Sequence, residues 1–210
     1  DRLGELDTIL AAAAELDLRP VIGVRARLTT KGAGKWVEST GDRDVFDVPV
    51  PFLTINSVAP TIMHFGTEEQ KKFFLPRIAA GELHFSIGYS EPGAGTDLAS
   101  LRTGAVRDGD DYVVNGQKMW TSLIAYADYV WLAVRTNPEA KKHRGISMLI
   151  MPTTAEGFSW TPVHTMSGVD TSATYYQDVR IPVSNLVGEE NAGWKLVTNI
   201  QAGGGLYAQR

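Results

Sequence analysis

Residues 91–97 (EPGAGTD) form a stretch whose residue types suit the binding of an anion or of the polar edge of a ring. Proline cannot continue a strand because it lacks a backbone N–H, and glycine favours a sharply turned backbone. Successive N–H groups in such a bend can form a concave anion site, which Ser90 and Thr96 would flank with hydroxyl donors. A plain β-turn between two strands has the same composition, so the stretch alone leaves both interpretations open.

A second group of chemically useful residues lies in NGQKMWTS (residues 115–122), one hairpin later. Trp120 offers a flat apolar face with an N–H donor, and Ser122 lies two residues on, at the same side of a strand. The bend and this Trp-x-Ser ledge could together hold a flavin ring. Packing in the core is the alternative for Trp120, because tryptophan in a strand is usually well buried.

Alternation of apolar and polar residues predicts that both groups belong to a β domain over residues 84–182. The predicted strands are HFSIGYS, TGAVRD, YVVNGQKMW, YVWLAVRT, GISMLIM, FSWTPV and TYYQDVRIP. The dipeptides Asp108-Gly109 and Asn115-Gly116 tolerate positive φ, so we expect tight hairpins at both. The pattern indicates an antiparallel sheet.

Three further segments are expected outside the β domain. Residues 47–83 have apolar residues at helical spacing, interrupted by Pro60, and Thr67 is a predicted N-cap with acidic residues in the first turn. Residues 183–210 begin another helical region. Residues 1–46 read as a helix, a strand and a Gly-rich loop, which is typical of an α/β layer. The predicted fold class is α+β, an antiparallel β-barrel-like domain preceded by helices, with an α/β-like N-terminal segment.

Composition and charge exclude several classes of protein. The 210 residues carry a formal net charge of -4 with scattered Lys and Arg, so no basic patch marks a nucleic-acid-binding protein. The absence of cysteine excludes disulfides and thiolate metal sites, and the four histidines lack metal-ligand spacing, so no metal is expected. No apolar run approaches the roughly 20 residues of a membrane span, and we expect a cytoplasmic protein.

Several blocks, in this order, resemble the flavin-binding middle domain of the acyl-CoA dehydrogenase family. They are YSEPGAGTDLASLRT, DGDDYVVNGQKMWTS, ADYVWLAVRT, KHRGISMLIM and VRIPVSNLVGEENAGW. The preceding FGTEEQKKFFLPRIAAGE resembles the last helices of that family's N-terminal helical domain. The resemblance covers about residues 52–200. It implies an FAD-dependent enzyme that oxidises an acyl-CoA thioester between its α and β carbons, passes electrons to an electron-transfer flavoprotein or another acceptor, and forms a homo-oligomer.

The resemblance also implies roles for individual residues. Ser90 corresponds to the hydroxyl near the N5 and O4 edge of the flavin, Trp120 and Ser122 correspond to residues that line the isoalloxazine, and Thr96 corresponds to a hydroxyl near the acyl-CoA. Ile87, Gly88 and Tyr89 would act mainly through backbone or packing. The full cofactor-binding set implied is Ile87, Gly88, Tyr89, Ser90, Trp120, Thr121 and Ser122.

The residue that removes the α proton is not assigned. In most of the family it is a glutamate on a C-terminal helical bundle, of which this sequence shows only the beginning, so we expect an architecture truncated relative to the family. Glu91 is interpreted as fixing the bend through hydrogen bonds rather than as this base. A non-catalytic flavin- or CoA-binding module of the same fold remains an alternative to the enzyme.

Residues 1–46 are similar to a different family, the biosynthetic arginine decarboxylases, chiefly through GVRARL followed by KGAGKW. This similarity leaves a second alternative, a fragment of a pyridoxal-phosphate-dependent decarboxylase. One strand and helix cannot close a barrel that needs eight such units. The sequence therefore indicates a composite chain, joined near residues 44–50.

Overall fold

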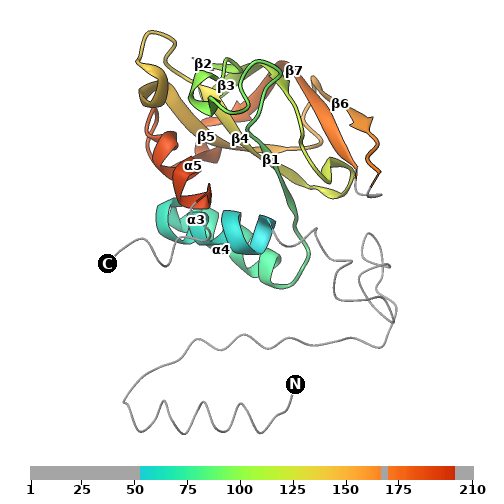
Figure 1. Cartoon of the computed structure of the whole chain (residues 1–210). Helices are drawn as coiled ribbons and strands as arrows, with labels where there is room; N and C mark the ends of the chain where they lie inside the picture. Colours follow the sequence, from blue (N-terminus) through green and yellow to red (C-terminus); the bar gives the residue numbers. More distant parts are fainter. Residues whose placement is uncertain (1–52, 167–169, 202–210) are drawn as a thin grey trace, which may run out of the picture. The chain divides into compact units, whose positions relative to one another are not determined.

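The computed structural model describes residues 53–166 and 170–201 of the chain, and Figure 1 shows their arrangement. The interpretation of residues 1–46 as decarboxylase-like falls outside these residues. So does the last part, residues 202–210, of the predicted C-terminal helical region. The α+β class is confirmed, because three α-helices accompany an eight-stranded sheet within the described part of the chain.

The described chain begins with helices. A π-helical turn, η2 (Thr54–Val58), leads into α3 (Ala59–Phe65), and α4 (Glu68–Ala79) follows. Thr67 caps α4 as predicted: its hydroxyl accepts the Gln70 N–H at 3.2 Å while the Gln70 side chain accepts the Thr67 N–H at 3.1 Å. This capping box fixes the start of α4 next to the sheet, because the Gln70 amide also donates to the Ser184 and Leu186 carbonyls.

The strands match the predicted segments closely. They are β1 (Phe85–Gly88), β2 (Gly104–Asp108), β3 (Asp111–Lys118), β4 (Tyr129–Arg135), β5 (Ile146–Pro152), β6 (Phe158–Val163), β7 (Thr171–Pro182) and β8 (Leu186–Val187). The main path runs β6-β7-β3-β2-β4-β5-β8, and β1 pairs with β4 off this path. The expectation of a wholly antiparallel sheet is wrong for two pairings, because both β1 and β2 pair with β4 in parallel. A parallel pair needs a long connection, and here the loop after β1, β2 and β3 all lie between β1 and β4 along the chain.

Only one of the two predicted hairpin turns is a turn. Gly109 has a φ of 63° and joins β2 to β3, whose residues Asp108 and Asp111 pair. Asn115 and Gly116 instead lie inside β3, opposite a bulge in β7 where Asp178 has a φ of 51°. The Asn115 side chain bonds both to the backbone N–H and to the carboxylate of Asp178, so it bridges two strands.

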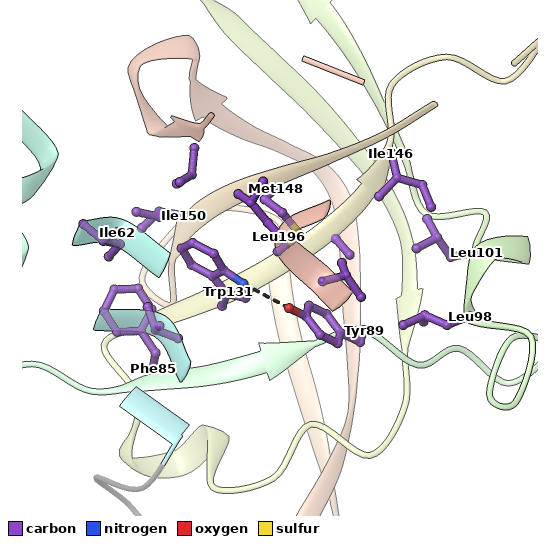
Figure 2. Close-up of a cluster of buried hydrophobic side chains, with 14 of the residues drawn as sticks. Ile62, Phe85, Tyr89, Leu98, Leu101, Trp131, Ile146, Met148, Ile150 and Leu196 are labelled. Atoms are coloured by element: carbon purple, nitrogen blue, oxygen red, sulfur yellow. Dashed lines mark hydrogen bonds between the residues drawn. The ribbon is translucent and has the colours of Figure 1, made fainter. Parts of the chain in front are cut away.

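Strand β4 separates two apolar clusters because its side chains alternate between the two faces. Trp131 and Ala133 point into the cluster shared with the helices, whereas Val130, Leu132 and Val134 point into the cluster beneath β3 and β7. Figure 2 shows the first cluster, in which the Trp131 indole N–H donates to the Tyr89 hydroxyl at 3.1 Å.

Helix α5 (Gly193–Gln201) packs beside α3 and β5 on the helical side of the sheet (Figure 1). A hydroxyl network fixes its start: Thr136 bonds to Ser147 at 2.6 Å and to the Asn191 side chain at 2.7 Å, and Ser147 accepts the Asn191 N–H. None of the helices described is long and apolar enough to cross a membrane.

Candidate functional site

The end of β1 belongs to the core rather than to an open surface. Ile87 pairs with Trp131 across to β4, and the Tyr89 ring is buried with its hydroxyl bonded to the same indole. Burial raises the pKa of the Tyr89 phenol, although the hydrogen bond from Trp131 opposes this, so the phenol stays protonated. The described contacts of Ile87 and Tyr89 are therefore packing contacts.

Gly88 is required by the same packing. A Cβ at this position would lie 2.9 Å from side-chain carbons of both Leu132 and Val130, and 3.3 Å from the Tyr176 hydroxyl. A larger residue would require the Leu132 and Val130 side chains to move. Its assignment to the cofactor remains a prediction, and any such contact would be made by backbone.

The bend that follows is the tip and neck of a compact loop, residues 91–103. Glu91 and Ala94 exchange two backbone hydrogen bonds of 3.1 and 3.0 Å around Pro92-Gly93. The Glu91 carboxylate then reaches to the other end of the loop, where it accepts the N–H of Arg102 at 2.7 Å and of Thr103 at 2.8 Å. This makes residues 91–103 an Ω-loop closed at its neck by one side chain. Glu91 thus fixes the bend, but not through the local hydrogen bonds expected from the sequence, because its carboxylate binds partners at the loop's far end.

A buried lysine completes the neck. Lys118, at the end of β3, has no exposed surface, and its ammonium donates to Glu91 Oε1 at 2.9 Å and to the Tyr89 carbonyl at 3.0 Å. Burial lowers the pKa of Lys118 to about 8, and the Glu91 carboxylate opposes that shift. Burial raises the pKa of Glu91, but the Lys118 charge and the hydrogen bonds from Lys118 and Thr103 outweigh it and hold the pKa below 4.5. Both groups are therefore charged at pH 7.

The bend and the Trp-x-Ser ledge lie together. The N–H of Met119 donates to the Ser90 carbonyl at 2.8 Å, directly beside the Lys118 contacts to Tyr89 and Glu91. The next residue, Trp120, turns sharply, with a φ of 64°, and leaves 59% of its surface exposed. Core packing of Trp120 is therefore excluded: the chain holds a large indole in solvent next to the bend. The expectation that Trp120 and Ser122 lie on the same side of a strand is wrong, because β3 ends at Lys118.

Thr121 and Ser122 tie the ledge to neighbouring strands. The Thr121 N–H donates to the Ser172 carbonyl at 2.9 Å, and its buried hydroxyl lies 3.3 Å from that of Thr174. The Ser122 hydroxyl donates to that of Thr171 at 3.3 Å, and its carbonyl accepts from Ser86. These contacts attach the segment that follows Trp120 to β1 and β7.

The outer half of the loop carries Thr96, whose side chain is exposed. The neighbouring Asp97 forms an exposed ion pair with Lys142 at 2.7 Å. Arg135 holds the base of this half, because its guanidinium donates to the carbonyls of Ala99 at 2.7 Å, Leu101 at 3.2 Å and Lys142 at 2.5 Å. The loop is thus pinned at two places, at its neck by Glu91 and along its flank by Arg135.

Open space surrounds two of the loop glycines. A Cβ on Gly93 or Gly95 would meet nothing within 4 Å. A pocket of about 330 Å³ lies beneath the bend, lined by Glu91, Pro92, Gly93, Ser100, Arg102, Thr103, Gly116 and Gln117. It is lined by the inner side of the loop rather than by Ser90 and Trp120. Trp120 and the loop tip at Pro92 and Gly93 are exposed, whereas Ser90 is half-buried.

Two residues of the site were not predicted, Lys118 and Arg135. Lys118 shares the inward phase of Tyr112 and Val114 in β3, and that phase, together with an acidic Glu91 in the bend, was the available signal. Nothing in the sequence distinguishes Arg135 from an ordinary charged strand end. Among the residues that the structure describes, no group of His, Asp or Glu side chains is placed to hold a metal ion.

Comparison with family models gives two matches on this chain. Residues 86–179 match "Acyl-CoA dehydrogenase, middle domain" and residues 38–82 match "Acyl-CoA dehydrogenase, N-terminal domain". The second match starts inside the segment interpreted as decarboxylase-like, and the boundary of that segment remains a prediction.

Curated relatives and solved structures agree with these matches. The chain is 83% identical over 163 residues to acyl-CoA dehydrogenase FadE26 and 61% identical over 153 residues to acyl-CoA dehydrogenase FadE29, both of Mycobacterium tuberculosis. These alignments cover 76% and 72% of this chain, but 41% and 40% of the relatives, so the chain spans about two fifths of their length.

Two solved structures are similarly related. A structure titled as the ChsE4-ChsE5 complex from Mycobacterium tuberculosis matches with a TM-score of 0.70 and 85% identity, covering 74% of this chain and 40% of that one. A structure titled "Tcur3481-Tcur3483 steroid ACAD" matches with a TM-score of 0.71 and 62% identity, covering 72% of this chain and 39% of that one.

Proposed function

The chain belongs to the acyl-CoA dehydrogenase family, and we propose that it forms the flavin- and thioester-binding part of an enzyme that oxidises an acyl-CoA to the α,β-unsaturated thioester. The observation that carries this proposal is the Met119 N–H bond to the Ser90 carbonyl. It brings a bend of small residues and a largely exposed indole to one place on the molecule.

The residues present fit FAD, the cofactor of this family. Trp120 presents a flat apolar face that is more than half exposed, which suits a heteroaromatic ring, and the segment that follows it is attached to β7. Ser90 and Ser122 supply hydroxyls for the polar edge of that ring. When bound, FAD accepts the β hydrogen of the acyl group as hydride.

The protein's own contribution would be to orient the thioester relative to the flavin ring. Thr96 and the open backbone beside Gly95 would hold the thioester end of the substrate near the ring, because small residues let a ligand approach the main chain. Glu91 is not proposed as the base, since its carboxylate is committed to the Arg102 and Thr103 N–H groups and to Lys118. We place the base outside the described residues.

The substrate class and the assembly follow from the relatives. One similar structure is titled a steroid ACAD, so we propose a thioester whose acyl group is attached to a steroid. Two similar structures are named for a pair of different chains, which favours a complex of two related subunits over the homo-oligomer expected from the sequence. Electrons would then leave through a flavoprotein acceptor.

The test uses the full-length protein, purified with any partner subunit that co-purifies. We expect a yellow protein whose flavin absorbance bleaches without air on addition of a steroid side-chain acyl-CoA, with the enoyl-CoA appearing. A protein that retains flavin but is bleached by no acyl-CoA, steroidal or straight-chain, would instead be the non-catalytic binding module. A protein that takes up no FAD at micromolar concentration would refute the proposal.

A further inference from the structure

The buried ion pair at the neck of the Ω-loop carries an inference about how the site is held. The Lys118 ammonium donates to the Tyr89 carbonyl and to the Glu91 carboxylate. The backbone N–H of the next residue, Met119, donates to the carbonyl of Ser90, which lies between those two residues. Three hydrogen bonds therefore join residues 89–91 to residues 118–119. Two of the three depend on the Lys118 ammonium.

The same pair sets the shape of the loop that carries Thr96. The two oxygens of the Glu91 carboxylate accept hydrogen bonds from the Arg102 N–H, the Thr103 N–H and the Lys118 ammonium. Without that carboxylate the loop has no direct link between its two ends at the neck. Without Lys118 the carboxylate is a buried charge with no ammonium to balance it.

Simple stabilisation does not explain why the chain keeps this pair. Charged side chains almost never occupy fully buried positions unless they are paired, and apolar residues of similar volume often serve stability as well or better. The pair's distinctive product is geometric, because it fixes the Ser90 bend, the Trp120 ledge and the Thr96 loop against one another.

We propose that Lys118 and Glu91 are positioning residues for flavin binding, acting through Ser90 and Trp120 rather than by touching cofactor or substrate. This inference rests on the proposed function, because it takes FAD to be the ligand of the bend and the ledge. It predicts that the pair can be removed at little cost in stability while the fit to FAD is lost.

The experiment compares three variants of the full-length protein: Lys118→Met, Glu91→Gln and the double variant. Each single change leaves one buried charge uncompensated, so both should lower the melting temperature. The double variant has no lone charge, and its melting temperature should return close to that of the wild type. Its affinity for FAD should stay at least roughly tenfold below wild type, because both Lys118 contacts to residues 89–91 are gone and a glutamine amide has one acceptor oxygen where the carboxylate had two.

Hydrogen exchange supplies a readout that does not need the cofactor. In the apo double variant, the amides of Met119, Arg102 and Thr103 should exchange roughly tenfold faster than in the wild type, while the amides of β4 are unchanged. The matched control is Asp108→Asn with Arg180→Met, which removes an exposed ion pair joining β2 to β7 and should alter neither FAD affinity nor these amides.

Recovery of both stability and FAD affinity in the double variant would overturn the inference, because the pair would then be structural only. Unchanged exchange at Met119, Arg102 and Thr103 would overturn it as well. If the wild type itself takes up no FAD, the proposed function fails, and the exchange measurement still decides whether the pair holds the loop.

Discussion

The N–H of Met119 donates a 2.8 Å hydrogen bond to the carbonyl of Ser90, which joins the end of β3 to the end of β1. These two strands are not neighbours in the sheet, since β1 pairs only with β4. The contact therefore forms because the segments that follow β1 and β3 lie side by side. It places Ser90 and the glycine-rich loop next to the segment that carries Trp120, and each of these can be altered separately.

Replacing Trp120 with glycine should separate its binding role from its structural role. The left-handed backbone at Trp120 costs a residue with a Cβ roughly 1–2 kcal/mol, which glycine avoids. We expect Trp120→Gly to be more stable than Trp120→Ala by about 1 kcal/mol, while both bind FAD roughly tenfold more weakly. Urea unfolding and FAD titration measure the two effects.

The control for this prediction is Trp160→Ala. Trp160 lies in the edge strand β6 and is 41% exposed, so Trp160→Ala removes a comparable side chain from another part of the surface. Its FAD affinity should equal that of the wild type. An equal loss of affinity in both variants would mean that the ledge is not the ring's support.

Replacing Gly95, inside the bend, and Gly88, before it, with alanine should change the free energy of unfolding in different ways. A methyl group on Gly95 enters open space with no strained φ, so Gly95→Ala should leave the free energy of unfolding unchanged or raise it by up to about 1 kcal/mol. The same methyl on Gly88 collides with Leu132 and Val130, so Gly88→Ala should lower it by about 1–3 kcal/mol.

Ligand binding decides what Gly95 is for. If the backbone beside it receives the thioester or the flavin, Gly95→Ala should raise the KM for acyl-CoA or the Kd for FAD severalfold in a fully stable protein. Wild-type values of both constants in this variant would show that the open space is ordinary solvent.

Local patterns predicted most of the elements, because their causes are local. Continuous runs of apolar residues mark β4 and β5, and the Thr67–Gln70 capping box marks the start of α4. The Asn115-Gly116 turn was wrong for a physical reason. Inside β3, Gly116 is needed because a Cβ there would lie 2.6 Å from the Thr103 side chain, and the Asn115 side chain bonds to Asp178 in the bulge of β7. These are long-range contacts, and a hairpin turn has the same two residue types.

The site was predicted in its parts but not in its connections. Ser90 and Trp120 stand out by residue type, whereas Lys118 looks like any strand lysine until Glu91 is known to lie beside it. The parallel pairing of β1 with β4 is likewise a long-range choice, made by packing of both faces of β4 and not by the sequence of β1. Contacts distant in sequence leave no periodic signal.

Arg135 should be irreplaceable by lysine. Its planar fork reaches the carbonyls of Ala99, Leu101 and Lys142 at once, and a lysine ammonium cannot span all three. We expect Arg135→Lys to lower the free energy of unfolding by about 1.5–3 kcal/mol, the worth of a lost charged hydrogen bond, and to speed amide exchange in residues 98–101.

The comparison for Arg135 is Arg180→Lys. Arg180 is exposed and pairs with Asp108 and Asp111 across the sheet, so its replacement should lower the free energy of unfolding much less than Arg135→Lys does. Equal costs at the two positions would show that the three carbonyl contacts of Arg135 contribute no more than a surface ion pair.

Acid should unfold this protein partly through Glu91. Its pKa lies below 4.5 in the folded state, because Lys118 and the backbone donors outweigh the effect of burial, so the unfolded chain binds the proton more readily. The stability that Glu91 contributes is therefore fully present above pH 4.5 and is lost as the pH falls through the lower, folded value. Urea unfolding between pH 6 and pH 3 should show a loss of stability that is smaller in Glu91→Gln, which has no carboxylate to protonate. The exposed Glu139→Gln should keep the wild-type slope, and an equal slope in all three proteins would mean that the neck carboxylate gains nothing from its partners.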